Sequence, residues 1–157
     1  MSRPNDRALD YHYEYDRLQT FTNWPLDFIR AEDLAADGFI YVGIDDQAAC
    51  VFGGHVLAGW EEGDIPNEEH KKHGPDCPFV SGQDVGNVRL VDEDLFRAAL
   101  GGNLVGAIRA LAASANIDMK HKVGWASIHA AAQNGHLSIV RTLLNRGANI
   151  NARDFQG

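Results

Sequence analysis

Short apolar segments alternate with glycine, proline and acidic turns over residues 10–82, the first half of the chain. Two helices are predicted here, at Tyr11–Phe21 and at Ala31–Asp37. The segment Asn23-Trp24-Pro25 separates them, because the residue before a proline disfavours the α region. Gly38 follows the second helix, at a position where glycine commonly ends one.

Three extended segments come next, Phe39–Val42, Ala48–Phe52 and Val56–Ala58, with polar or glycine-containing turns between them. A short helix is predicted over Glu68–His73, and Pro75 ends it. Together these elements predict a small antiparallel sheet with short helices. A domain of about seventy residues buries little apolar surface and often needs a metal ion or a disulfide for stability.

A different pattern, with a period of 33 residues, begins at Asp92. Self-similarity at this period predicts stacked pairs of helices. Residues 83–91 lack hydrophobic periodicity and are interpreted as a linker, and the polar residues 1–9 as a flexible tail. The positions that match between the two copies are Gly102 and Gly135, Leu104 and Leu137, Leu111 and Leu144, and Ala115-Asn116-Ile117 and Ala148-Asn149-Ile150.

Charge and composition narrow the classes of function. The 157 residues carry a formal net charge of −8, which argues against nucleic acid as the main partner because phosphate binding needs a basic surface. No apolar run approaches the length of a membrane span, and the first residues are too polar for a signal peptide, so no membrane partner is expected. The expected location is intracellular, in the cytoplasm, the nucleus or both. In such a reducing compartment the two cysteines are expected to be metal ligands or buried thiols.

Both cysteines lie in one segment, from Cys50 to Cys77, which also contains His55, His70 and His73. Two thiolates and an imidazole in a segment rich in glycine, proline and acidic residues are suited to a small module stabilised by Zn²⁺.

Motifs distributed over about residues 10–82 carry a family resemblance. They are Arg17-Leu18-Gln19-Thr20-Phe21, Trp24-Pro25, Leu34-Ala35-Ala36-Asp37-Gly38-Phe39, Tyr41-Val42-Gly43, Asp46, Cys50, Leu57, Trp60, Gly63-Asp64, Pro66, Glu69-His70 and Cys77. Together they resemble the baculoviral IAP repeat (BIR) domain, and the run from Glu68 to His73 is most similar to survivin and its relatives. The second copy of the 33-residue pattern, from Gly124, resembles an ankyrin repeat in which Ala126-Ser127-Ile128-His129 replaces the usual Thr-Pro-Leu-His opening.

The resemblance implies an α+β fold class. A small BIR zinc-type fold at residues 10–82, with a three-stranded antiparallel sheet and short helices, is followed by an all-α segment of about two ankyrin repeats at residues 92–157. Each repeat buries its apolar face on the next, so about three are normally needed for stability. The chain is therefore expected to be a piece of a longer ankyrin protein.

The resemblance also implies a Zn²⁺ site. Cys50, His70 and Cys77 match the first, third and fourth ligand positions of the BIR family, whereas Gly53 stands at the second. Three alternatives remain open. His55 supplies the fourth ligand, a water molecule completes a three-ligand site, or the metal is absent and the two cysteines are buried thiols.

A peptide site is implied as well. BIR domains of the peptide-binding kind receive a free N-terminal Ala, whose ammonium is held by an acidic residue beside a Trp while its backbone adds to the third strand. The matching positions are Asp64 for the acidic residue, Trp60 for the Trp, and Val56-Leu57-Ala58 for the strand, in which Leu57 and Ala58 are expected to contact the peptide. His73 stands where survivin-like members have a histidine that contacts a phosphothreonine.

The leading hypothesis is a non-enzymatic interaction module of the inhibitor-of-apoptosis type. Its BIR domain binds peptides with a free N-terminal Ala, and its ankyrin repeats recruit a second protein. The alternative is a structural scaffold in which a metal-poor BIR fold caps the ankyrin stack. An enzymatic role for Cys50 and His70 lacks a Gly-rich oxyanion turn before the cysteine, and the sequence contains no RING-type cluster of Cys and His.

Overall fold

The computed structural model describes residues 9–121 and 124–149, which fall into two compact units, residues 1–87 and 88–157. Apart from Leu9, the tail predicted at residues 1–9 lies outside the described residues. The linker predicted at residues 83–91 spans the division between the units, and the first helix of the second unit begins within it, at Leu90.

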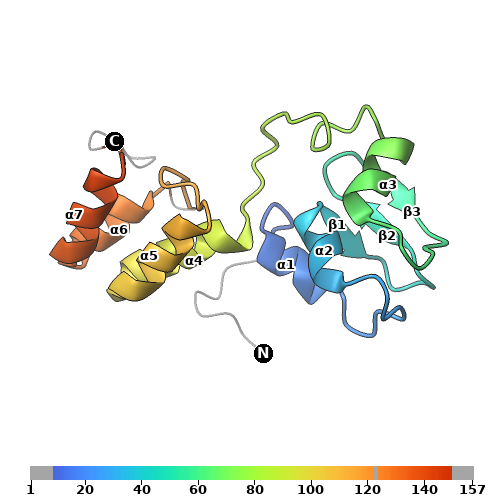
Figure 1. The fold of residues 1–157 in the computed structure, drawn as a ribbon, viewed down its shortest axis with the longest axis horizontal. Helices are drawn as coiled ribbons and strands as arrows, with labels where there is room; N and C mark the ends of the chain where they lie inside the picture. The colour runs from blue at the N-terminus through green and yellow to red at the C-terminus, as the bar shows by residue number, and fades with distance from the viewer. Residues whose placement is uncertain (1–8, 122–123, 150–157) are drawn as a thin grey trace. The chain divides into compact units, whose positions relative to one another are not determined.

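A three-stranded antiparallel sheet forms the centre of the first unit, as predicted (Figure 1). Its strands are β1 (Phe39–Tyr41), β2 (Ala48–Cys50) and β3 (Val56–Leu57), in the order β1-β2-β3. Phe39 pairs with Cys50, and Ala48 pairs with Leu57. β3 therefore hydrogen-bonds to β2 on one side and presents its other edge, while β2 carries Cys50 into the buried interior.

Three short helices accompany the sheet: α1 (Glu14–Gln19), α2 (Ala31–Ala36) and α3 (Pro66–His73). α1 is shorter than predicted, since Tyr13 is extended and precedes the first helical residue. α3 begins two residues earlier than predicted. Pro66 occupies its first turn, where the fixed φ of proline favours helix and its missing N–H costs no hydrogen bond.

Arg17 is the largest fully buried side chain of the first unit. Its Nε donates to the carbonyl of Ala35 at 2.8 Å, its Nη1 to the carbonyls of Tyr11 and His12, and its Nη2 to Oδ1 of Asn87 at 2.8 Å. Burial lowers the pKa of Arg17 to about 10, so the guanidinium remains protonated at neutral pH. One side chain thus ties the beginning and the end of the unit to α2.

The second unit, as far as its residues are described, forms two helix pairs, α4 (Leu90–Gly101) with α5 (Leu104–Ala112), and α6 (Ser127–Gln133) with α7 (Leu137–Asn145). Gly102 and Gly135, 33 residues apart, each follow the first helix of a pair with a left-handed φ, of 78° and 74°. α5 and α7 begin 33 residues apart as well. The period in the sequence is therefore a period in the structure.

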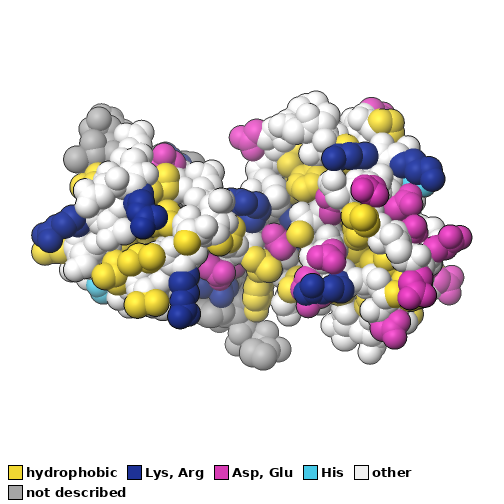
Figure 2. Space-filling model, viewed as in Figure 1, with side chains coloured by type: hydrophobic (Ala, Val, Ile, Leu, Met, Phe, Trp, Pro, Cys, Tyr) yellow, Lys and Arg dark blue, Asp and Glu magenta, His cyan; other side chains and the backbone are white. Residues whose placement is uncertain are grey.

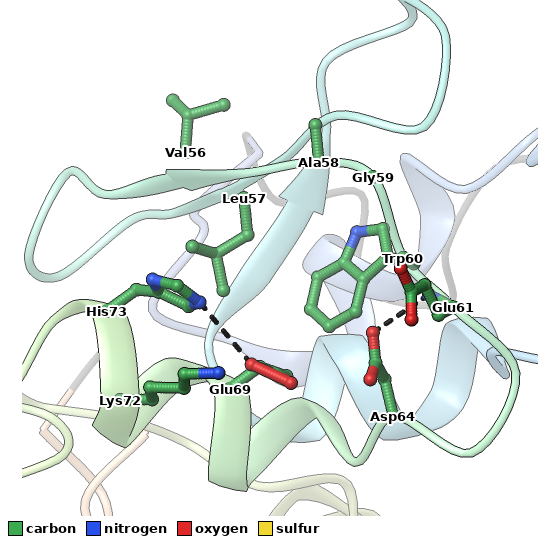
Figure 3. A pocket seen from close by; sticks show the side chains of 10 residues that line it. All are labelled: Val56, Leu57, Ala58, Gly59, Trp60, Glu61, Asp64, Glu69, Lys72 and His73. Atoms are coloured by element: carbon green, nitrogen blue, oxygen red, sulfur yellow. Dashed lines mark hydrogen bonds and ion pairs between the residues drawn. The ribbon is translucent and has the colours of Figure 1, made fainter.

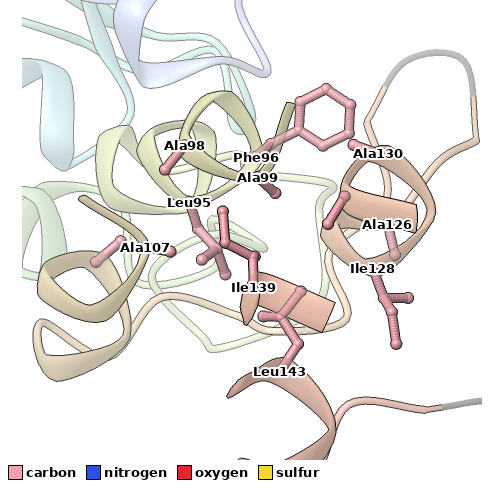
Figure 4. Packing of buried hydrophobic residues seen from close by; sticks show 12 residues of the cluster. Leu95, Phe96, Ala98, Ala99, Ala107, Ala126, Ile128, Ala130, Ile139 and Leu143 are labelled. Carbon is pink, nitrogen blue, oxygen red and sulfur yellow. The ribbon is translucent and has the colours of Figure 1, made fainter. Parts of the chain in front are cut away.

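Alanines alternate with larger apolar residues in the core of the second unit (Figure 4). Leu95, Ile139 and Leu143 are fully buried, and Ala99, Ala107 and Ala130 allow the helices to approach closely. The mixed α+β fold class and the helical character of the second unit are confirmed. None of the helices in the described part of the chain is long and apolar enough to cross a bilayer.

Candidate metal centre and peptide groove

Three potential metal ligands meet in the interior of the first unit. Cys50 ends β2, His70 lies in α3 and Cys77 lies in the loop after α3; all three are buried. Their ligand atoms lie within 4.8 Å of one another, and the two Sγ atoms are 3.7 Å apart. Two Zn–S bonds of about 2.3 Å at a tetrahedral angle place their sulfurs about 3.8 Å apart. The spacing of the two thiols therefore fits one zinc ion.

His70 is oriented by an acidic partner. Its Nδ1 lies 2.7 Å from Oδ2 of Asp37, whose other oxygen accepts a hydrogen bond from Asn67 at 2.8 Å. The second ring nitrogen of His70, Nε2, is buried and has no hydrogen-bond partner. A carboxylate on one imidazole nitrogen with the other left to a metal is the usual arrangement around zinc-bound histidines. The unsatisfied Nε2 is thus a second indication that these residues fit Zn²⁺.

Electrostatics favour the thiolate form of Cys50. Burial, the largest single cause, raises the pKa of its thiol, but the proximity of His70 and the backbone N–H groups of Gly53 and Phe52 together outweigh burial and lower it. Burial likewise disfavours a charged His70, yet the hydrogen bond with Asp37 and the contact with Cys50 raise the pKa of His70 to about 10. Thiolate is the form of cysteine that binds metals, whereas Nε2 of His70 would have to release its proton to bind Zn²⁺.

The fourth predicted ligand, His55, is not brought into this group. Its Nε2 lies 3.5 Å from Oδ1 of Asp76, and its ring lies so close to Gly74 that a Cβ there would be 2.6 Å from Cδ2 of His55. The glycine at position 74 leaves room for the ring in this place. The structure therefore assembles Cys50, His70 and Cys77 and sets His55 beside them, toward Asp76.

A groove of about 480 Å³ lies between β3 and α3 (Figure 3). All five residues predicted for peptide binding line it: Leu57, Ala58, Trp60, Asp64 and His73. Val56 of the predicted strand and Lys72 beside His73 also line it, as do three residues that the sequence did not single out for the groove: Gly59, Glu61 and Glu69.

Trp60 is fixed in this groove by its neighbours. Its backbone N–H donates to Oδ2 of Asp46 at 2.9 Å, and its ring meets Phe39 edge-on with 6.2 Å between the centroids. In Figure 3 the indole stands between the strand segment above it and the carboxylates of Asp64 and Glu69. Trp60 is only 7% exposed, so it contributes both to the core and to the wall of the groove.

The polar side chains of the groove fall into an acidic part and a mixed part. Oδ2 of Asp64 accepts from the backbone N–H of Glu61 at 2.8 Å, which fixes the turn and leaves the other oxygen for a ligand. Nε2 of His73 lies 3.4 Å from Oε2 of Glu69, with Lys72 beside them. Helical spacing could have identified Glu69 from the sequence. It lies four residues before His73, and residues i and i+4 share one face of a helix.

The first unit as a whole is acidic. Residues 1–87 contain 17 Asp or Glu and 6 Lys or Arg, whereas residues 88–157 contain 5 and 8. Acidic side chains gather on the visible face of the first unit in Figure 2. A surface of this sign attracts cationic ligands and repels anionic ones.

Comparisons with known proteins identify both units. The Inhibitor of Apoptosis domain family, BIR, matches residues 17–81, and the ankyrin repeat family matches residues 123–155. Among solved structures, the first BIR domain of DIAP1 bound to a Grim peptide aligns with a TM-score of 0.50 and 36% identity, over 52% of this chain and 84% of that one. The autoinhibited form of that domain aligns with a TM-score of 0.51 and 35% identity, over 53% of this chain and 86% of that one.

Curated relatives carry the same domain within longer proteins. An apoptosis inhibitor, IAP, of Cydia pomonella granulosis virus is 43% identical over 48% of this chain and 28% of its own length. The E3 ubiquitin-protein ligase XIAP of Xenopus tropicalis is 47% identical over 56% of this chain and 18% of its own length. The chain thus spans less than a third of the length of these relatives.

This chain belongs to the class of modules that act by binding other proteins. The fold, the metal-ligand group and these matches define that class. More particularly, the chain carries a BIR domain of the inhibitor-of-apoptosis family followed by an ankyrin repeat. The family predicted from the sequence is confirmed.

Proposed function

We propose that the groove between β3 and α3 binds the free N-terminus of a partner protein that begins with Ala. The observation that carries the proposal is the position of two carboxylates, Asp64 and Glu69, beside Trp60 in a groove that opens along an unpaired strand edge. The solved DIAP1 domain that aligns with this unit is bound to a peptide, which supports a peptide as the ligand.

The acidic part of the groove suits an α-ammonium group. Glu61, Asp64 and Glu69 contribute three carboxylates, against one lysine, Lys72. Charge-assisted hydrogen bonds to such a group contribute about 1.5–3 kcal/mol each. An N-terminal ammonium is the one backbone group of a protein that offers several donors and a positive charge together.

The strand edge suits an extended peptide backbone. Among the described residues β3 is paired with β2 alone, so the N–H and C=O groups on its other side are available to a further strand. Ala58 and Gly59 continue the segment next to Trp60; the small side chain of Ala58 and the absence of one at Gly59 leave space for a ligand there. We expect a small first residue such as Ala to fit beside the indole and a larger one to bind more weakly.

His73 and Lys72 lie at the other part of the groove and would meet later residues of the peptide. His73 is engaged with Glu69 at 3.4 Å, and this contact weakens its attraction for an anion. A phosphorylated side chain would have to replace that partner. We therefore expect acidic or phosphorylated side chains of the peptide to contribute less to its affinity than the N-terminal Ala does.

Calorimetric titration of the full chain tests the proposal. An Ala-initiated peptide should bind at least about tenfold more tightly than its N-acetylated twin, because acetylation removes the charge and the ammonium donors. A peptide that begins with Leu is the control for the small first residue and should also bind more weakly. Equal affinity for the acetylated and free peptides would refute the proposal that the groove binds free N-termini. It would favour the alternative that the chain is a structural scaffold.

The domain composition extends the proposal to the whole chain. Relatives with this BIR domain are named as apoptosis inhibitors. We assign this chain the same kind of role, regulation of apoptosis through captured protein N-termini, with the ankyrin segment binding a second protein. We expect the first unit to co-purify one protein and the second unit a different one. Each protein should be lost when the corresponding unit is deleted.

A further inference from the structure

The second unit has a groove of its own, of about 440 Å³, between α4 and α5. Small residues from both helices line this α4–α5 groove: Ala98, Gly106, Ala110 and Ala113. Its charged lining residues are Asp94, Arg97 and Arg109. All of these residues belong to the first helix pair, so the groove lies within one repeat.

The second helix pair shows what the same positions hold where one pair packs on another. At the 33-residue period, Gly106 corresponds to Ile139 and Ala110 to Leu143. Ile139 and Leu143 are 1% and 0% exposed and belong to the core that the two pairs share (Figure 4). In the first pair these large side chains are replaced by a hydrogen atom and a methyl group, which leaves the hollow.

Charged residues replace buried ones at two further positions of this face. Asp94 and Arg97 correspond to Ser127 and Ala130, which are 1% and 0% exposed. A further ankyrin-type helix pair stacked on this face would bury both charges, which is unfavourable. The face is therefore suited to an occupant that is slender and polar.

The unused hydrogen-bond donors of the groove favour an anionic occupant. Arg109 is exposed and forms no ion pair with the residues that the structure describes, whereas Nη2 of Arg97 donates to Oε1 of Glu93 at 3.0 Å. Oδ1 of Asn103, another lining residue, accepts from the N–H of Gly106 at 2.9 Å, which leaves its Nδ2 hydrogens for an acceptor. A guanidinium and an amide thus face the groove together.

We propose that the α4–α5 groove binds an acidic segment of a partner protein, with one carboxylate on Arg109 and the adjoining backbone over the small residues. An arginine can hold a carboxylate through two parallel hydrogen bonds, which provides orientation as well as affinity. The charge of the unit has the matching sign, since residues 88–157 contain 8 Lys or Arg and 5 Asp or Glu. The proposal rests on the proposed function of the ankyrin segment, the binding of a second protein, and names the surface and the ligand chemistry.

Fluorescence anisotropy with the full chain tests the proposal. The probe is a labelled peptide of alternating Ala and Glu, acetylated so that it lacks the ammonium group proposed to bind the first unit. It should bind saturably. Its twin with Gln in place of Glu should bind at least about tenfold more weakly, because the charge-assisted hydrogen bonds to Arg109 are lost.

Three variants locate the binding. Arg109→Gln should weaken binding of the Glu peptide at least about tenfold. Arg141→Gln makes the same change of charge at an exposed position of α7 outside the groove, and should bind as the wild type does. Ala113→Leu keeps the charge and places a larger side chain in the groove, so it should also weaken binding. Circular dichroism verifies that the variants keep their helices.

Three results would overturn the proposal: no saturable binding by the wild type, unchanged binding by Arg109→Gln, and equal losses in Arg109→Gln and Arg141→Gln. Sedimentation velocity examines another occupant. A wild-type dimer that Ala113→Leu abolishes would show that a second copy of the chain fills the groove, which would also overturn it. These failures are distinct from failure of the proposed function, which requires only that the second unit co-purify a protein.

Discussion

The Nδ1 atom of His70 lies 2.7 Å from Oδ2 of Asp37, a residue 33 positions earlier that follows the last residue of α2. Through this contact the end of one helix sets the orientation of a ring on another. Nε2 of His70 is consequently directed away from Asp37 and has no protein hydrogen-bond partner, which leaves it to a metal ion.

Replacement of Asp37 by Asn should weaken zinc binding about 10–100-fold, because the ring of His70 loses its anionic partner and its orientation. Competition with a chromophoric chelator measures the affinity. Asp33→Asn, an exposed position on the same helix with the same change of charge, is the control and should bind zinc as the wild type does. An Asp37→Asn affinity within twofold of the control would contradict the orienting role.

Replacement of Asp64 by Asn should lower the affinity for a peptide with a free N-terminal Ala about 10- to 100-fold, the equivalent of one charge-assisted hydrogen bond. The amide oxygen can still accept from the N–H of Glu61, so the turn is retained. Calorimetry against the wild type gives the value. Glu68→Gln removes a charge from an exposed position of α3 that does not line the groove. Equal losses in both variants would indicate a general charge effect in place of a specific contact.

Replacement of Arg17 by Lys should destabilise the first unit by more than about 2 kcal/mol, since an ammonium group cannot reach all four acceptors of the guanidinium and buried carbonyls lose their donors. Urea unfolding followed by tryptophan fluorescence, in a Trp125→Phe background that removes the tryptophan of the second unit, reports on this unit through Trp24 and Trp60. The exposed Arg30 makes only a weak ion pair, at 3.9 Å from Glu32, so Arg30→Lys should change stability by less than about 0.5 kcal/mol. Similar midpoints for the two variants would disprove the role of Arg17.

Replacement of Leu143 by Ala should destabilise the second unit by about 2–5 kcal/mol, because it opens a cavity among buried residues of the helix pairs. Leu137→Ala provides the same chemical change on the same helix, at a side chain that is 70% exposed. Its effect should stay below about 0.5 kcal/mol. Thermal unfolding followed by helical circular dichroism compares them, and equal losses would show that Leu143 does not belong to a packed core.

Several features of this protein could be predicted from local patterns. The 33-residue period predicted the helix pairs because each pair repeats the same short-range pattern of glycine and leucine, which reappears as Gly102 and Gly135 in the structure. The three extended segments form β1, β2 and β3, because short apolar runs between turns usually form strands. The match of Cys50, His70 and Cys77 to family ligand positions predicted a metal group, and these residues do meet.

Contacts between distant segments could not be read from those patterns. The sequence alone determined where helices, strands and turns form, because the positions of these elements depend on neighbours a few positions away. Tertiary packing decided that Asp37 orients His70, that Arg17 reaches Asn87, and that His55 faces Asp76. Such contacts depend on how whole elements pack together, and no short-range pattern contains that information.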